Sequence, residues 1–302
     1  MTLEQLRVFI AVAECEHVTK AAQSLNLTQS AVSAAIAALE SRHAVKLFSR
    51  VGRRIELTES GRIFLAEARA VLARTQAAEL ALSELSGLQR GALTIHASQT
   101  IASYWLPQYL VQFHQTYPRI KINLVNGNTT QVARAVEIGS ADLGFVEGRV
   151  EAEHLVQQAI ARDQLVLVVG RKHPWASRRS VSSSDLLSTG WVLREVGSGT
   201  RSEFEEALKH WKISIERMNI VLELPSNEAV RAAVEAGAGA TVISEFVAAA
   251  GLKTGSLKAI ALPLPQRPYT VLRHRERYFS RAAQAFLDEI KDKKKVAAPK
   301  SL

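Results

Sequence analysis

The 302-residue sequence predicts a mixed α/β fold whose two ends are patterned differently. Residues 1–90 show helical spacing with one pair of short extended pieces, whereas the chain from residue 91 alternates apolar strands with helices. The length exceeds what one compact core normally holds, and a hydrophobic content of 47% supports more than one core. We therefore expect an N-terminal domain over residues 1–58, a linker helix over 59–88 and a larger domain over 91–302.

The N-terminal domain begins with a helix, a short second helix and a third helix after a tight turn. The first helix covers residues 3–14 and carries its apolar side chains on one face, at Leu6, Phe9, Ile10 and Ala13. Thr28 is a favourable N-cap for the third helix, because its hydroxyl can accept from a free backbone N–H. This order of elements is typical of a helix-turn-helix.

The third helix separates apolar and small side chains onto opposite faces. Val32, Ile36 and Leu39 share one stripe at about 100° per residue. Small groups on the opposite face let a helix enter a major groove, where hydroxyls and methyls meet base edges. An ordinary alanine-rich surface helix is the alternative interpretation. The candidate DNA-binding residues here are Thr28, Gln29, Ser30, Ser33, Ala34 and Ala37.

Residues 46–61 predict a β-hairpin beside the third helix. Gly52 marks a turn between two short extended pieces, and Arg53 and Arg54 lie at its tip. Together with Arg50, these arginines can reach phosphates or a narrow minor groove, as in a winged helix-turn-helix. A solvated hairpin without a DNA contact is the alternative.

A long helix follows, with Thr58 as its expected cap and Gly61 in its first turn. Its apolar positions recur in steps of four and three, which is a heptad pattern. One helix cannot bury such a seam alone, so a partner helix from a second copy is expected, with packing onto the chain's own domains as the alternative. The seam consists of Phe64, Ala68, Val71, Thr75, Ala78, Leu82 and Leu85.

From residue 91 the pattern predicts an α/β domain with helices covering both faces of a largely parallel sheet. Expected strands lie at 92–98, 120–126, 142–147, 164–170, 191–195, 219–224, 240–244, 257–262 and 269–274. Expected helices lie at 101–116, 129–138, 200–211, 226–237 and 279–291.

Three of these strands end in polar loops that precede helices. Open α/β sheets bind ligands at the carboxyl ends of their strands, where helix N-termini attract anions. Ordinary helix capping by Ser and Thr is the alternative for each loop taken alone, and Arg194 or Arg201 can add a positive charge. The candidate effector-binding residues are Ser98, Gln99, Thr100, Asn128, Thr129, Gly199, Thr200 and Arg201.

Composition argues against several other classes of protein. A single cysteine, Cys15, excludes an internal disulfide and is more consistent with a small buried side chain than with a redox switch. The eight histidines show no metal-ligand spacing, and no GxSxG or HExxH motif is present, so neither a metal nor catalytic residues are expected. No signal peptide or membrane-spanning run is expected, which suggests the cytoplasm.

The net charge of +9 favours polyanionic partners but is unevenly distributed. Residues 1–90 carry 11 basic and 9 acidic residues, whereas residues 266–302 carry 10 basic and 4 acidic ones. The nearly neutral N-terminal domain implies that contact pattern, rather than bulk attraction, gives specificity. The basic tail is expected to be solvated, with a DNA contact as the alternative.

The sequence resembles the LysR-type transcriptional regulators over its whole length. The matching residues include two alanines in the second helix, a hydroxyl-rich turn and a Val-Ser pair in the third helix. They are Ala21, Ala22, Thr28, Gln29, Ser30, Val32, Ser33, Leu39, Glu40, Leu47, Phe48, Arg50, Leu57, Thr58 and Gly61. The resemblance implies a two-lobed effector domain similar to periplasmic binding proteins. The loop at 197–201 is similar to that of members controlling sulfur and carbon assimilation, which implies a sulfur oxyanion or a small carboxylate as effector.

Two departures from the family pattern lie in and after the third helix. Ala35 stands where the family usually has glutamine, which removes a polar contact and implies an unusual target sequence. His43 and Ala44 replace the family's Leu-Gly. Without that glycine, we expect the helix to end without a left-handed residue or to extend slightly.

The expected function is that of a sequence-specific, double-stranded DNA-binding regulator controlled by a small, anionic effector. The resemblance implies a homodimer or homotetramer, with RNA polymerase as a further partner for an activator. A small-ligand-binding protein or enzyme with a vestigial DNA-binding domain is one alternative. A non-specific architectural DNA binder is another, although it requires a more basic N-terminal domain.

Overall fold

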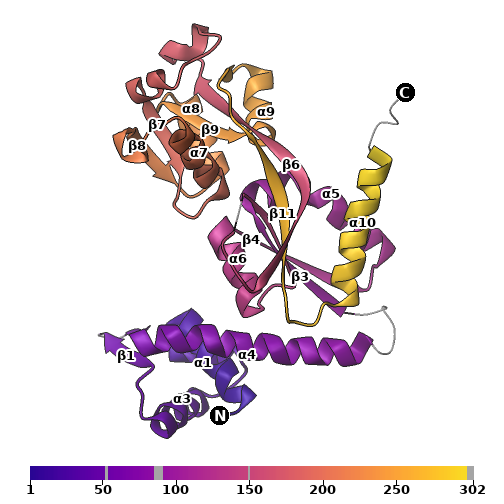
Figure 1. Cartoon of the computed structure of the whole chain (residues 1–302). Coiled ribbons are helices and arrows are strands. Elements are labelled where there is room, and N and C mark those ends of the chain that lie inside the picture. Colours follow the sequence, from indigo (N-terminus) through magenta and orange to yellow (C-terminus); the bar gives the residue numbers. More distant parts are fainter. Residues whose placement is uncertain (52–53, 85–90, 149, 298–302) are drawn as a thin grey trace. The chain divides into compact units, whose positions relative to one another are not determined.

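The computed structural model describes residues 1–51, 54–84, 91–148 and 150–297 (Figure 1). The chain divides into two compact units, each described by itself below. The first comprises Met1–Ser86 with Ile138–Ser140, and the second comprises Gly87–Glu137 with Ala141–Leu302.

The first unit is a helical bundle with one β-hairpin. Phe9 packs against Phe48 and Phe64, with ring centroids 5.4 and 4.8 Å away, so one aromatic cluster joins the first helix, the hairpin and the long helix. The hairpin strands pair antiparallel from Phe48↔Leu57 to Val51↔Arg54. The elements are α1 (Leu3–Cys15), α2 (Val18–Ser24), α3 (Gln29–His43), β1 (Phe48–Val51), β2 (Arg54–Leu57) and α4 (Glu59–Glu84).

Two helix starts in this unit confirm the expected caps. The Thr28 hydroxyl accepts a hydrogen bond from the Ala31 amide at 3.2 Å, at the start of α3. The Thr58 hydroxyl accepts one from the Gly61 amide at 3.0 Å, at the start of α4. A Cβ on Gly61 would lie 2.1 Å from the Leu47 carbonyl oxygen, so only glycine permits this approach between α4 and the loop before the hairpin.

The expectation for the end of α3 is wrong. Ala44 adopts the left-handed conformation, with φ 50° and ψ 34°, and its amide donates to the Glu40 and Ser41 carbonyls. The chain must reverse sharply there, because the next amide, of Val45, also returns to the Glu40 carbonyl at 3.1 Å. A left-handed alanine costs about 1–2 kcal/mol, and the surrounding hydrogen bonds hold it in place.

The second unit alternates strands and helices (Figure 1). Its elements begin with β3 (Gly91–Ser98), the π-helical turn η1 (Ile101–Trp105), α5 (Pro107–Thr116), β4 (Ile120–Gly127), α6 (Thr129–Ile138), β5 (Leu143–Glu147) and β6 (Leu155–Gly170). They continue with β7 (Gly190–Arg194), α7 (Gly199–His210), β8 (Asn219–Leu224), α8 (Asn227–Glu235), β9 (Ala240–Ser244), α9 (Glu245–Thr254), β10 (Leu257–Ile260), β11 (Gln266–His274) and α10 (Arg281–Ala297). Short 3₁₀ turns lie at Pro174–Ser177, Ser184–Ser188 and Ile215–Arg217.

The strands follow the order β4-β3-β5-β11-β6-β9-β7-β8, with β10 beside β6. We call the part around β3, β4, β5 and β11 lobe 1, and the part around β7, β8, β9 and β10 lobe 2; β6 runs through both. Each lobe has its own core, centred on Phe113, Phe145 and Phe286 in lobe 1 and on Trp191 and Phe204 in lobe 2. The parallel pairs β3–β4, β3–β5, β7–β8 and β7–β9 align the carboxyl ends of strands within each lobe.

All nine strands expected in this unit are present, and three features were not expected. The strand β6 begins at Leu155, nine residues before the apolar run at 164–170, and α9 follows β9 without an intervening loop. The helix expected at 101–116 is split into a π-helical turn and an α-helix that starts at Pro107. No helix among the described residues is long and apolar enough to cross a membrane.

Candidate functional site

The structure gives α3 the two faces that its sequence predicts. Val32 and Leu39 are buried in the core of the first unit. The opposite face is open to solvent along the helix, at Thr28, Gln29, Ser30, Ser33, Ala34 and Ala37. The Thr28 hydroxyl is engaged with the Ala31 amide and with the Ser30 hydroxyl, 3.0 Å away, so it holds the helix start in place.

Glu40, at the end of α3, connects the candidate reading helix to the hairpin. Its carboxylate accepts from the Leu47 amide at 2.8 Å, the Phe48 amide at 3.2 Å and the Lys46 ammonium at 2.7 Å. Burial would raise the pKa of the Glu40 carboxyl, but these three donors lower it below its ordinary value. The sequence shows Glu40 only as a residue of the family motif and does not predict its role in joining α3 to the hairpin. The indication in the sequence is a charged residue on the inward face of the helix.

Two of the candidate arginines, Arg50 and Arg54, belong to the strands of the hairpin. The Arg50 backbone belongs to β1, where it pairs with Ile55, and the Arg54 backbone belongs to β2, where it pairs with Val51. Arg53 and the turn glycine lie outside the described residues. The hairpin therefore has the form of the wing that the sequence predicts.

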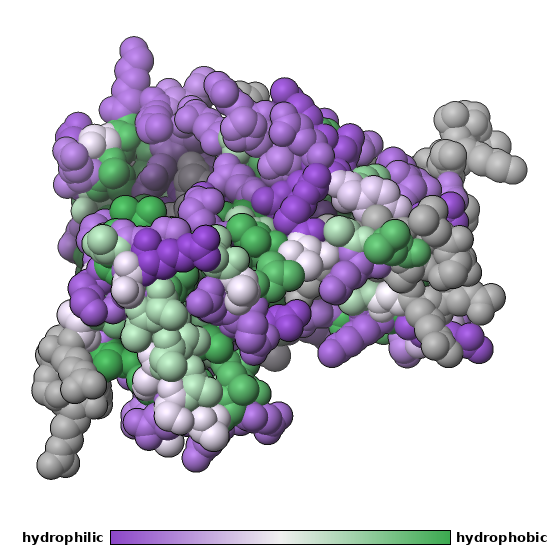
Figure 2. Space-filling view, turned by 90° about the horizontal axis from the view of Figure 1, so that it is seen from below, coloured by the Kyte–Doolittle hydropathy of each residue, from purple (hydrophilic) through white to green (hydrophobic). Residues whose placement is uncertain are grey.

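The heptad seam of α4 is buried at its start and exposed further on. Phe64 and Ala68 pack in the core of the first unit, whereas Val71 and Leu82 are 41% and 71% exposed. Leu85, the last seam position, lies outside the described residues. Figure 2 shows exposed hydrophobic side chains in several places on one face of the molecule, with hydrophilic ones between them.

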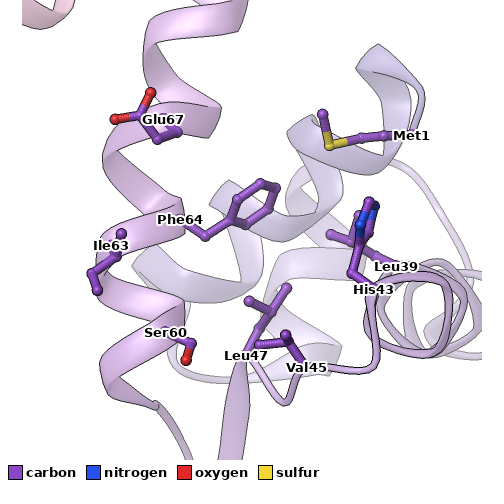
Figure 3. A pocket seen from close by; sticks show the side chains of 9 residues that line it. All are labelled: Met1, Leu39, His43, Val45, Leu47, Ser60, Ile63, Phe64 and Glu67. Carbon is purple, nitrogen blue, oxygen red and sulfur yellow. The ribbon is translucent and has the colours of Figure 1, made fainter.

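An apolar pocket of about 390 Å³ lies in the first unit, between the start of α1, the end of α3 and α4 (Figure 3). Phe64 and Leu47 lie centrally in it, and Glu67 and Ser60 lie along the α4 side. The complete lining is Met1, Leu39, His43, Val45, Leu47, Ser60, Ile63, Phe64 and Glu67.

In the second unit, the three predicted loops converge at the carboxyl ends of β3, β4 and β7. Thr100, Thr129 and Thr200 are all buried. A Cβ on Gly199 would lie 2.7 Å from the Thr129 hydroxyl oxygen, so the start of α7 in lobe 2 lies directly against the start of α6 in lobe 1. The Thr130 amide also donates to the Gly197 carbonyl at 3.3 Å, across the two lobes.

Asn227, at the start of α8, joins the first loop to lobe 2. Its side-chain amide donates to the Thr100 hydroxyl at 3.0 Å, and its backbone amide donates to the Gln99 side-chain carbonyl at 2.6 Å. Ser98, next to Gln99, has a buried hydroxyl without a hydrogen-bond partner among the described residues. An unpaired buried hydroxyl beside a predicted ligand loop is a favourable position for a ligand atom.

Two buried guanidinium groups reach this cluster of loops. Arg194 donates through Nη1 to the Asn227 side-chain carbonyl at 2.7 Å. Arg267 donates through Nη1 to the Thr200 hydroxyl at 3.0 Å. The sequence indicates Arg194 as a possible positive charge for the loops, but it contains no local signal for Arg267.

Arg267 is completely buried and lies beside two carboxylates. Its Nε and Nη2 atoms contact Asp163 Oδ2 at 2.8 and 2.6 Å, and Nη2 lies 3.8 Å from Glu147 Oε1. Burial alone would lower the pKa of the Arg267 guanidinium, but Glu147 and Asp163 raise it above its ordinary value. Arg267 and Asp163 are paired positions of β11 and β6, 104 residues apart in sequence, which is why no local pattern indicates their contact.

Arg201, the predicted cation of the third loop, is directed to other partners. Its guanidinium pairs with Glu205 at 2.7 Å and with Glu223, and it also donates to the Arg194 carbonyl at 3.1 Å. Its charge is thus largely compensated within lobe 2. Among the described residues, no group of three or more His, Cys, Asp or Glu side chains is arranged to hold a metal ion.

Comparison with known proteins agrees with the geometry of both units. Residues 3–62 match the family model "bacterial regulatory helix-turn-helix protein, lysR family", and residues 86–295 match the "LysR substrate binding domain". The chain is 36% identical to the uncharacterized HTH-type transcriptional regulator YeiE of Escherichia coli (strain K12), over 95% of this chain and 96% of that protein.

Solved structures with the same fold include two relatives with different coverage. CbnR, a LysR family transcriptional regulator, is 22% identical with a TM-score of 0.73, over 97% of this chain and 99% of that one. The regulatory domain of CcmR from Synechocystis PCC6803, in complex with 2-PG, is 26% identical with a TM-score of 0.62, over 70% of this chain and 99% of that one. The chain belongs to the LysR family of DNA-binding transcriptional regulators with an effector-binding domain.

Proposed function

We propose that this regulator responds to a small anion that binds where the loops after β3, β4 and β7 meet. The observation that carries the proposal is the approach of two buried guanidinium groups, of Arg194 and Arg267, to the hydroxyl-rich ends of these strands. The starts of α6, α7 and α8 add backbone N–H groups and favourable dipoles for negative charge. We propose that the chain acts by binding and not by catalysis.

The relative CcmR supports an anionic effector, because its regulatory domain binds 2-phosphoglycolate (2-PG). The resemblance of the loop at 197–201 to that of family members controlling sulfur and carbon assimilation suggests a sulfur oxyanion or a small carboxylate. All of these ligands present two or more negatively charged oxygens, which is the chemistry that guanidinium groups and helix N-termini recognise.

On the DNA side, we propose that α3 enters the major groove while Arg50, Arg53 and Arg54 contact the backbone. The exposed Val71 and Leu82 support pairing of α4 with a second copy, which gives a dimer or tetramer and sets the spacing of the two half-sites. For an activator, RNA polymerase is the further partner. The effector then shifts the equilibrium between two arrangements of the assembly.

The test replaces hydroxyls at the proposed effector site. We expect Thr100→Val and Thr200→Val to weaken binding of 2-PG, phosphate, sulfate or small carboxylates about tenfold, the effect of losing one charge-assisted hydrogen bond. Titration calorimetry measures this binding, and mobility shift without ligand should give unchanged DNA affinity. Thr116→Val is the matched control, because among the described residues its hydroxyl donates to the Gln112 carbonyl of its own helix and to no group of the proposed site. Equal ligand binding by wild type and both site variants would refute this location.

A further inference from the structure

We propose that the effector's anionic group binds the guanidinium of Arg194 in exchange for the carboxylate of Glu195, which holds that position when no effector is bound. The ligand class is a carboxylate or phosphate that presents two oxygens to one guanidinium. The inference rests on the proposed function, since it assigns an exchangeable anion position to the same cluster of loops.

An oxyanion already occupies the place where the predicted loops meet. The Arg194 Nε and Nη2 atoms contact Glu195 Oε2 and Oε1 at 2.8 and 2.9 Å, which is a two-pronged contact. The Asn128 side-chain amide donates to the same Glu195 Oε1 at 3.3 Å. Donors from the end of β7 in lobe 2 and from the start of α6 in lobe 1 thus meet on one carboxylate.

The two partners differ in how easily each can leave. The Arg194 side chain is 5% exposed, whereas the Glu195 side chain is 24% exposed. A buried guanidinium without an anion is costly, but a carboxylate near the surface recovers most of its hydration when it turns outward. The cation is therefore the permanent part of the pair and the carboxylate is the exchangeable part.

The backbone supports the same distinction. Arg194 is the last residue of β7, and its Nη1 is held by Asn227, which is fully buried. Glu195 comes after the strand, and its neighbour Val196 is 72% exposed. The Glu195 side chain can change its rotamer without disturbing the pairing of β7 with β8 and β9.

The surroundings stabilise negative charge at this position. Burial by itself would raise the pKa of the Glu195 carboxyl, but hydrogen bonds from Arg194, its own backbone amide and Asn128, together with the charge of Arg194, lower it. A ligand oxyanion that takes this place meets the same donors. It also replaces the contact between Glu195 and Asn128, which is one of the hydrogen bonds that join the two lobes.

The experiment removes the internal competitor in the full-length chain. Glu195→Gln keeps the size of the side chain and removes its charge, and Glu195→Ala removes the competing group altogether. Glu205→Gln is the matched control, because Glu205 pairs with Arg201 in the same lobe. Titration calorimetry with inorganic phosphate and with 2-PG measures the affinity, and circular dichroism melts report folding.

We expect both Glu195 variants to bind one or both probes at least about tenfold more tightly than wild type, and the Glu205 variant to bind within about twofold of wild type. Adding Arg194→Lys to a Glu195 variant should cancel its gain in probe affinity, since an ammonium cannot hold two oxygens side by side. Equal or weaker binding by both Glu195 variants, with Thr100→Val and Thr200→Val still impaired, would overturn the exchange and leave the proposed site standing. Binding of neither probe by any variant would overturn both proposals.

Discussion

The two units place their functional groups in opposite ways. The first unit exposes small side chains on α3 whose polar atoms are mostly available to a partner, and it holds this surface with one buried carboxylate, Glu40. The second unit buries most of its candidate groups, and it pairs its buried guanidinium groups with carboxylates, as Arg267 and Arg194 show. Changes on the exposed face of α3 should therefore remove binding without unfolding, whereas changes to the buried pairs of the second unit should affect stability and binding together.

The largest expected effect comes from breaking the buried pair of the second unit. Arg267→Met should lower the free energy of unfolding of this unit by about 3–5 kcal/mol, because it leaves the buried Asp163 and Glu147 carboxylates without their cation. Urea unfolding measures the change. Arg178→Met, which removes a more exposed pair with Asp185 in the same unit, should cost at most about 1 kcal/mol. An equal loss of free energy of unfolding in the two variants would contradict the view that the second unit depends on its buried ion pair.

The next effect concerns DNA affinity. Ser33→Glu should weaken specific binding by roughly a hundredfold, or about 2–3 kcal/mol, because it brings a longer, negative side chain against the DNA. Mobility-shift titration measures this loss, and the melting temperature should stay unchanged because Ser33 is exposed. Ser33→Ala keeps the small surface and should cost much less. Unchanged affinity in the Glu variant would show that this face does not meet DNA.

Glu40 gives an intermediate effect with a defined dependence on pH. Glu40→Gln should destabilise the first unit by about 1–2 kcal/mol at neutral pH, since three hydrogen bonds lose their charged acceptor. The pKa of Glu40 is lowered in the folded state, so this stabilisation is fully present above the ordinary glutamate pKa of 4.5 and is lost as pH falls through the folded-state pKa. Chemical unfolding at neutral and acidic pH measures the free energy of unfolding of wild type and of Glu40→Gln. A difference between the two that grows as the pH falls would disprove the prediction.

The smallest expected effect is a gain in stability. Ala44→Gly should stabilise the first unit by about 1 kcal/mol, because glycine adopts the left-handed conformation without the steric cost that alanine carries. Thermal unfolding measures the gain, with DNA affinity unchanged. If the variant is less stable than wild type, the backbone freedom of glycine in the unfolded chain outweighs the relieved strain.

Local patterns predicted most of the fold because its elements have strong periodicity. The apolar stripe of α3 and the nine apolar runs of the second unit each lie within a few residues of the observed elements. The helix α9 was missed because Ser244 is both the last residue of β9 and the N-cap of α9, so no loop residues announce the change. The first half of β6 was missed because its polar residues break the apolar pattern.

Contacts between distant residues limited the prediction of the site. The three loops were recognisable from hydroxyls before helices, but their partners were not. Asn227 lies 128 residues from Gln99, and Asp163 lies 104 residues from Arg267, so these contacts exist only once β6, β11 and α8 have been placed. Arg201 has one local partner, Glu205, four residues further along the same helix, and one distant partner, Glu223 on β8, which its position in the loop does not reveal.

The register of β6 defines where the ladder of one lobe ends and that of the other begins. Gln164 pairs with β11 of lobe 1, and the next residue, Leu165, pairs with β9 of lobe 2, so the ladders change partner across one peptide bond. The pair of Arg267 and Asp163 lies beside this junction between Gln164 and Leu165. Because paired ladders resist stretching, we expect a relative motion of the lobes to be a rotation about this junction, with its largest displacement at β4 and β8, the outermost strands. We therefore expect a ligand that binds close to this junction to cause its largest displacement far from its own site, at the two outer strands of the unit.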